Sequence, residues 1–199
     1  IAEWQYFICF IAAQNGWPLE DWDVKQAFPQ AKTSYDPESH SQTEIWFRPP
    51  HPFPTKYQVT PGTAIRVASD HTHYGLASAP RRFYFYIRGI FQEHGLVVGL
   101  YDECLFILFE EKTGKLRGLC GFHVDDGLMT GDAYFYSIMN KIAKRITFGK
   151  RQKIQFVFCG VRIKQLPDFT VELDQENAID QILYIDVDSK RSDGDSCTS

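Results

Sequence analysis

The 199-residue sequence lacks a C-x-x-C pair, a long apolar run and an excess of basic charge. Its five cysteines are odd in number and widely spaced, which excludes a zinc ribbon and a disulfide scaffold and indicates a reducing compartment. The first apolar stretch ends at Ala13, far short of the roughly 18–20 residues that a bilayer span needs. We therefore expect an intracellular protein, in the cytoplasm or nucleus, with no membrane partner.

No basic segment precedes the first apolar stretch, so we expect that this N-terminus is not a secretory signal. The sequence begins with Ile1 rather than Met, so we expect a piece of a longer protein. Hydrophobic residues make up 44% of the chain, aromatic residues 15% and charged residues 23%. This composition can bury a sizeable core in a single domain and excludes a disordered polypeptide.

The net charge of −4 conceals an uneven distribution along the chain. Residues 1–164 carry 19 Lys and Arg against 16 Asp and Glu, whereas residues 165–199 carry 2 against 9. The stretch from Lys141 to Lys164 holds eight basic residues and no acid. It fits either a surface that follows a phosphate backbone or a solvated helix face with its following loop.

The hydrophobic pattern predicts an α+β fold. Apolar residues at helical spacing predict helices over residues 1–15, 80–94 and 133–148. Alternating or compact apolar runs predict strands over residues 19–24, 44–48, 65–68, 105–109, 116–124, 127–130 and 154–163. Strands and helices do not alternate regularly, so we expect an antiparallel sheet covered by helices on one face. Residues 1–184 would form this domain, and the acidic residues 185–199 are expected to be disordered.

Three aspartates are the candidate functional residues. Asp125 and Asp126 follow an apolar strand at a tight turn, and Asp23 lies at the end of another predicted strand. Asp-Asp-Gly is also ordinary turn chemistry, and a single instance is more often a solvated hairpin. Three carboxylates that converge from two strands, however, can hold two Mg²⁺ ions for phosphoryl transfer.

Six blocks in order resemble the reverse transcriptase domain of copia-type retrotransposons. The Asp23–Phe28 block, DVKQAF, is similar to the family's DVKTAF block, and His123–Asp126, HVDD, to its YVDD box. The other four blocks are IWFRPP at residues 45–50, YGLASAPR at 74–81, YDECLFI at 101–107 and FCGVRI at 158–163.

The resemblance implies a polymerase palm with partial fingers, which acts as an RNA-directed DNA polymerase on a template-primer duplex of RNA or DNA and dNTPs, within a Pol polyprotein. It implies that Asp23 and Asp125 bridge two Mg²⁺ ions, which Mn²⁺ could replace, with Asp126 more peripheral. It also implies a nucleotide site and a primer grip. Phe28 would be the aromatic gate against a ribose 2′-hydroxyl, and Tyr74 and Gly75 would contact the nucleotide or template. Lys150 or Arg151 would protonate or neutralise the leaving pyrophosphate. The primer grip would comprise Phe158, Cys159, Gly160 and Val161.

The sequence departs from the family pattern at a few positions. His123 replaces the usual Tyr, and Ala77 and Ser78 replace the usual Lys-Gln. An alternative is therefore a catalytically inactive remnant that at most binds nucleic acid. A third hypothesis, a metal-dependent hydrolase or metal protein that uses His71 and His73, is disfavoured by the order of the six blocks.

Overall fold

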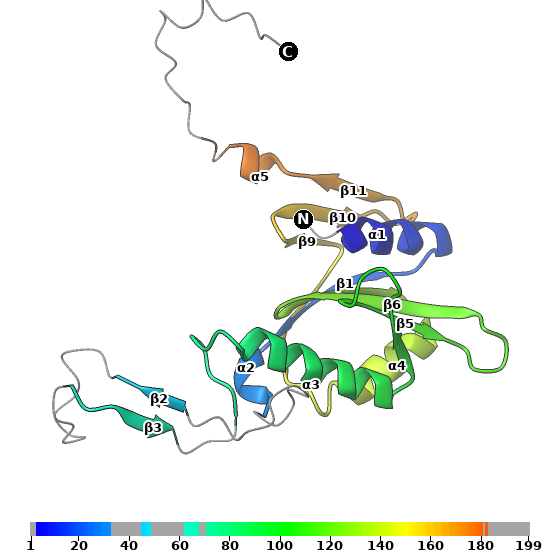
Figure 1. Cartoon of the computed structure of the whole chain (residues 1–199). Coiled ribbons are helices and arrows are strands. Elements are labelled where there is room, and N and C mark those ends of the chain that lie inside the picture. Colours follow the sequence, from blue (N-terminus) through cyan, green and yellow to red (C-terminus); the bar gives the residue numbers. More distant parts are fainter. Residues whose placement is uncertain (1–2, 33–44, 49–61, 68–70, 181, 183–199) are drawn as a thin grey trace, which may run out of the picture.

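A six-stranded antiparallel sheet is the centre of the structure (Figure 1). The computed structural model describes residues 3–32, 45–48, 62–67, 71–180 and 182. Along the sheet the strands run in the order β4-β5-β6-β7-β1-β8. Their bounds are β1 Leu19–Val24, β4 Leu96–Val98, β5 Leu105–Phe109, β6 Leu116–His123, β7 Asp126–Gly131 and β8 Phe148–Lys153. The predicted α+β fold with an antiparallel sheet is confirmed.

Two smaller antiparallel sheets and five helices complete the described residues. One small sheet has the order β11-β10-β9 and the other pairs β2 with β3. The remaining strands are β2 Ile45–Phe47, β3 Ile65–Val67, β9 Gln155–Phe158, β10 Val161–Gln165 and β11 Val171–Asp174. The helices are α1 Glu3–Asn15, α2 Ala27–Gln30, α3 Ala79–Glu93, α4 Ala133–Ile142 and α5 Glu176–Ile179.

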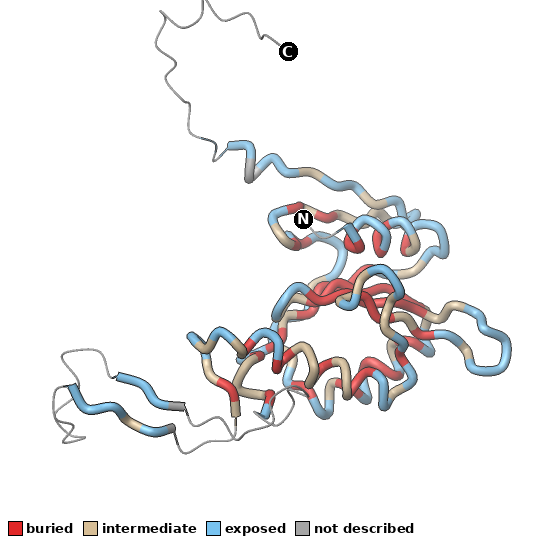
Figure 2. Tube along the Cα trace, viewed as in Figure 1, coloured by how far each residue is buried: buried red, intermediate tan, exposed pale blue. Residues whose placement is uncertain are grey.

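Alternate residues of the central strands face two separate cores. Cys120 and Met129 belong to the core that packs against α3 and α4, whereas Leu119 and Leu128 belong to the core that contains α1 and the β9–β10 hairpin. The layer with α3 and α4 and the layer with α1 and the β9–β10 hairpin lie on opposite sides of the sheet (Figure 1). Buried residues line the sheet and the sides of both layers that face it (Figure 2). The expectation that helices cover one face is therefore wrong: the buried face of α1, including Trp4, covers the other.

Glycines in the central strands let large aromatic rings lie directly on the sheet. Gly118 and Gly131 are cross-strand partners on β6 and β7, and a Cβ on either would overlap the buried Phe135 ring from α4. On the opposite face, a Cβ on Gly121 would overlap the Trp4 ring from α1. Each core thus depends on a missing side chain in the sheet.

We expect Gly118→Ala and Gly121→Ala each to lower the free energy of unfolding by about 2 kcal/mol, because a buried ring would have to move. Urea unfolding at neutral pH measures this effect. Gly89→Ala in α3 is the control, because its Cβ would meet nothing within 4 Å. An unchanged midpoint for Gly121→Ala would contradict the packing of α1 on this face.

Two predicted elements are wrong at their boundaries. The helix predicted over residues 133–148 ends at Ile142, where the backbone N–H of Arg145 turns back to the Ile142 carbonyl, and β8 begins at Phe148. Ile146 keeps the apolar spacing of the helix, but Phe148 falls off this stripe and packs edge-on against Trp22 of β1. The strand predicted over residues 154–163 is a hairpin, because the chain reverses at Cys159 and Gly160.

Three further expectations concern the C-terminal residues, membrane spans and two short strands. The acidic residues 185–199 lie outside the described residues. In the described part of the chain, no helix is both long and apolar enough to cross a membrane. The strands expected near residues 44–48 and 65–68 correspond to β2 and β3.

Candidate active site

The end of β1 and the β6–β7 turn bring the predicted acids together. Asp23 pairs directly with Asp126 across the two antiparallel strands, so their side chains share one face. The backbone N–H of Val24 donates a hydrogen bond to the Asp125 carbonyl at 2.8 Å, which fixes the turn against the strand end. Asp125 lies in the two-residue turn itself and, like the other two acids, is partly exposed.

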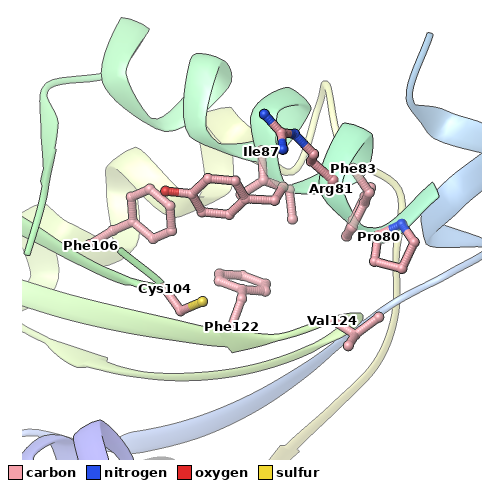
Figure 3. A pocket seen from close by; sticks show the side chains of 9 residues that line it. Pro80, Arg81, Phe83, Ile87, Cys104, Phe106, Phe122 and Val124 are labelled. Carbon is pink, nitrogen blue, oxygen red and sulfur yellow. The ribbon is translucent and has the colours of Figure 1, made fainter. Parts of the chain in front are cut away.

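The turn has an unfavourable backbone conformation. Val124 has φ of 60°, a region that β-branched residues rarely occupy, and its side chain is 43% exposed. A cavity of about 270 Å³ separates this turn from the start of α3, with Val124 and Pro80 at one side of it (Figure 3). The walls are mostly apolar and include Phe83, Phe106 and Phe122. The cavity lies on the α3 face of the sheet, whereas Asp126 shares the opposite face with Leu128.

A fourth carboxylate lies in the same cluster. Asp21 precedes Asp23 by two residues on β1, is only 6% exposed and accepts a hydrogen bond of 2.9 Å from the Gln152 amide. Burial raises the pKa of Asp21; the Gln152 bond opposes this effect, while the negative charges of Asp126 and Asp23 add to it. Its two-residue spacing from Asp23 is the sequence signal that could have identified it.

The pKa of Asp126 is also raised, first by burial and then by the charges of Asp125 and Asp23, with His123 opposing these effects. No described basic side chain forms an ion pair with Asp23, Asp125 or Asp126. The cluster therefore holds uncompensated negative charge. A cation among these carboxylates would relieve their mutual repulsion.

The oxygen donors fit a hard divalent cation. In the described residues, however, no group of three or more His, Cys, Asp or Glu side chains lies close enough to hold a metal ion. The same result means that, among the described residues, no third metal ligand lies near His71 and His73. The observed arrangement is thus a facing pair, Asp23 and Asp126, with Asp125 beside it in the turn.

The structure separates the two candidates for acting on the leaving pyrophosphate. Lys150 is exposed on β8, and its positive charge lowers the pKa of Asp21, which places it electrostatically with the acid cluster. Arg151 is occupied on the other face, where its guanidinium lies 3.7 Å from the centre of the Trp22 ring and bonds to Glu20 at 3.1 Å. Lys150 alone is therefore available to the aspartates.

Glu20 is a structural acid that the sequence analysis missed. It is 2% exposed and accepts hydrogen bonds from Trp22 at 2.7 Å and from Arg151, with Lys153 at 2.6 Å. Burial acts to raise the pKa of Glu20, but the bonds from Lys153, Trp22 and Arg151 outweigh burial and lower it below its usual 4.5. These contacts hold β1 and β8 together on the face of the sheet opposite Asp21 and Asp23.

Because the folded pKa of Glu20 is lowered, its stabilising contribution is complete above the unfolded pKa of about 4.5 and is lost as pH falls through the folded value. We expect Glu20→Gln to cost about 1–2 kcal/mol at pH 7, since the partners Arg151 and Lys153 are themselves partly exposed. Urea unfolding at pH 7 and pH 3.5 should show a smaller acid-induced loss for the variant than for the parent chain. Glu172→Gln, which removes an exposed ion pair with Lys164, should change little at either pH.

Two predicted nucleotide-contacting residues lie together. The rings of Phe28 and Tyr74 are 4.9 Å apart between centroids, and Phe28 also contacts Phe83 of α3 at 6.2 Å. The hydroxyl of the buried Thr72 donates to the Phe28 carbonyl and fixes α2 against the following segment. Gly75 follows at φ of 89°, a conformation that favours glycine. Contacts with Tyr74, Phe83 and Thr72 therefore hold Phe28 in place in α2, five residues after Asp23.

The residues predicted to grip the primer form the β9–β10 turn. Phe158 and Val161 are paired and buried, and Cys159 and Gly160 make the two-residue turn with positive φ values. This is the backbone pattern of a type I′ hairpin turn. Burial raises the pKa of the Cys159 thiol, and the charges of Asp126 and Asp21 add to that effect, which places the turn near the acid cluster.

Gln30 is a further residue that the sequence analysis missed. Its amide nitrogen donates to the carbonyls of Lys25 at 2.6 Å and Thr147 at 3.0 Å, and its carbonyl accepts the Thr147 N–H at 2.8 Å. One side chain thereby joins the segment after Asp23 to the start of β8. No local pattern distinguishes this glutamine from others in the sequence.

The basic stretch from Lys141 to Lys164 is largely neutralised. Five of its eight basic residues form ion pairs: Arg145 with Glu93, Arg151 and Lys153 with Glu20, Arg162 with Asp174 and Glu176, and Lys164 with Glu172. Among described residues, Lys141, Lys144 and Lys150 have no ion-pair partner. A phosphate backbone would therefore find three uncompensated lysines rather than a continuous basic track.

Comparison with known proteins yields two curated relatives. The chain is 26% identical over 159 residues to a retrovirus-related Pol polyprotein from transposon RE1 and 25% identical over 159 residues to the one from transposon RE2, both of Arabidopsis thaliana. The predicted resemblance to copia-type retrotransposon Pol polyproteins is confirmed. Each match covers 79% of this chain and 10% of the relative, so the chain spans about a tenth of the length of these polyproteins.

Other comparisons add less to this relationship. No protein-family model matches the chain. Among solved structures, apo telomerase from Candida tropicalis, truncated from the C-terminal domain, matches with a TM-score of 0.49 and 9% identity over 88% of this chain and 40% of that one. The relationship to Pol polyproteins thus rests on sequence.

Proposed function

We propose that residues 1–184 form the palm and part of the fingers of a reverse transcriptase, an RNA-directed DNA polymerase within a retrotransposon Pol polyprotein. Its substrates would be a dNTP and a template-primer duplex of RNA or DNA. One observation carries the proposal: the strand end with Asp23 faces the Asp125–Asp126 turn in a chain related to Pol polyproteins.

In the proposed reaction, the primer 3′-hydroxyl loses its proton to water and its oxygen forms a bond to the α-phosphorus of the dNTP, while the bond to pyrophosphate breaks. Asp23, Asp125 and Asp126 would hold Mg²⁺, or Mn²⁺ in its place. When bound, the two ions lower the pKa of the 3′-hydroxyl and neutralise charge on the leaving group. Lys150, on the same face as Asp21, would donate a proton to the departing pyrophosphate or neutralise it.

Two further parts of the site would orient the reactants. Phe28, braced by Tyr74 and Phe83, would exclude a ribose 2′-hydroxyl and so favour dNTPs. The Phe158–Val161 turn would hold the primer end in line with the α-phosphorus. Tyr74 and Gly75 would contact the nucleotide or template.

The second candidate is an inactive remnant that binds nucleic acid without copying it. The departures from the family pattern at His123, Ala77 and Ser78 favour this alternative. The ion pairing of the Lys141–Lys164 stretch limits the positive charge available for nucleic acid under either proposal. Primer extension on poly(rA)/oligo(dT) with Mg²⁺, with Mn²⁺ and with a chelator distinguishes the two. Polymerisation predicts metal-dependent extension, whereas a remnant predicts salt-sensitive duplex binding with no extension under any condition.

A further inference from the structure

The pairing of β1 with β8 changes register beside Asp23. The shift falls between Trp22 and Val24, so Asp23 alone lies opposite two residues of β8, Gly149 and Lys150. Two residues against one define a β-bulge, a feature that redirects side chains next to functional sites. The orientation of the Asp23 side chain therefore depends on what occupies the bulge.

Gly149 leaves this space open. A Cβ built on Gly149 would lie 2.6 Å from Oδ2 of Asp23 and 3.6 Å from the Lys25 Cβ. A carbon and a carboxylate oxygen do not approach to 2.6 Å without a shift. Gly149 is not among the residues with positive φ, so its backbone conformation does not itself require a glycine, and the close contact of an added Cβ is with the Asp23 carboxylate.

We propose that Gly149 is a positioning residue, whose missing side chain lets the Asp23 carboxylate lie beside Asp126. Oδ2 is the end of a short flexible side chain, so an added methyl group displaces the carboxylate rather than the sheet. The backbone bonds of β1 to β8 and the Gln30 contacts stay in place. The catalytic consequence of this displacement rests on the proposed function; the displacement itself does not.

The test compares the parent chain with Gly149→Ala, with Gly89→Ala as a matched control and with Asp23→Asn as a reference for loss of the carboxylate. Carboxyl ¹³C resonances of the metal-free proteins report the position of Asp23, and Mn²⁺ binding followed by EPR reports its effect as a ligand. In Gly149→Ala we expect a shifted Asp23 resonance, about tenfold weaker Mn²⁺ binding and a kcat for primer extension lowered by about 10- to 100-fold with little change in KM for dTTP. Gly89→Ala should match the parent chain in all three.

An unchanged Asp23 resonance in Gly149→Ala overturns the proposal whatever the metal does. A shifted resonance with parental Mn²⁺ affinity also overturns it, because the displacement would then have no consequence for the site. If the parent chain neither binds Mn²⁺ nor extends a primer, the proposed function fails, and the metal-free resonance still decides whether Gly149 positions Asp23.

Discussion

Asp125→Asn is expected to lower the rate of primer extension by about a thousandfold. A metal ion contributes several kcal/mol to a phosphoryl-transfer transition state, and each 1.36 kcal/mol corresponds to a factor of ten in rate. Asparagine keeps the size of the turn residue while removing its charge, and the Asp125 carbonyl that holds Val24 is unaffected. Single-turnover extension of a primed template with saturating Mg²⁺ measures the loss.

Asp102→Asn is the matched control for this prediction. Asp102 lies outside the acid cluster and caps the following turn by accepting the Cys104 N–H at 2.8 Å. Its amide variant should retain parental extension. Equal losses in the two variants would mean that the acids of the β6–β7 turn have no special role.

The second large effect is expected from Phe28→Val, which should raise incorporation of ribonucleotides relative to deoxyribonucleotides by about 100-fold. In the proposed site the ring would exclude one hydroxyl group by contact, and removing it would relieve the clash with little effect on the deoxy substrate. Competing incorporation of rUTP and dTTP opposite poly(rA) gives the ratio directly.

Phe28→Tyr separates sugar selection from folding, because it retains the ring against Tyr74 and Phe83. This variant should keep the parental preference for dTTP. A parental ratio in Phe28→Val, with the variant folded, would show that another residue selects the sugar.

The site was predictable where local pattern and function coincide. Asp23 lies next to the last residue of the strand from Leu19 to Val24, and apolar β6 leads directly into the Asp125–Asp126 turn. The structure supplies the antiparallel pairing of β1 with β7 that makes these acids face each other. The contact of Phe28 with Tyr74 could not be predicted from local sequence pattern, because 45 intervening residues separate the two. Only the resemblance to the retrotransposon family predicts that both residues contact the nucleotide.

The missed features depend on tertiary packing. Ile146 continues the helical apolar stripe beyond the end of α4, whereas Phe148 packs against Trp22 at the start of β8. Gln30 acts through backbone groups that no sequence pattern reveals. The second covered face was missed because α1 has only a weak separation of apolar and polar sides, with Phe7 and Phe10 exposed. Gly149 looks like an ordinary helix stop in sequence, and only the bulge opposite Asp23 gives it a role.

The measurement that tests the central claim most directly is single-nucleotide addition by the purified chain to a primed RNA template. With poly(rA)/oligo(dT) and Mg²⁺, the account predicts addition of dTTP, no addition of dCTP, and none of either after chelation of the metal. If the folded chain binds the duplex but adds no nucleotide with Mg²⁺ or Mn²⁺, or adds both nucleotides equally, the chain is not a template-directed polymerase.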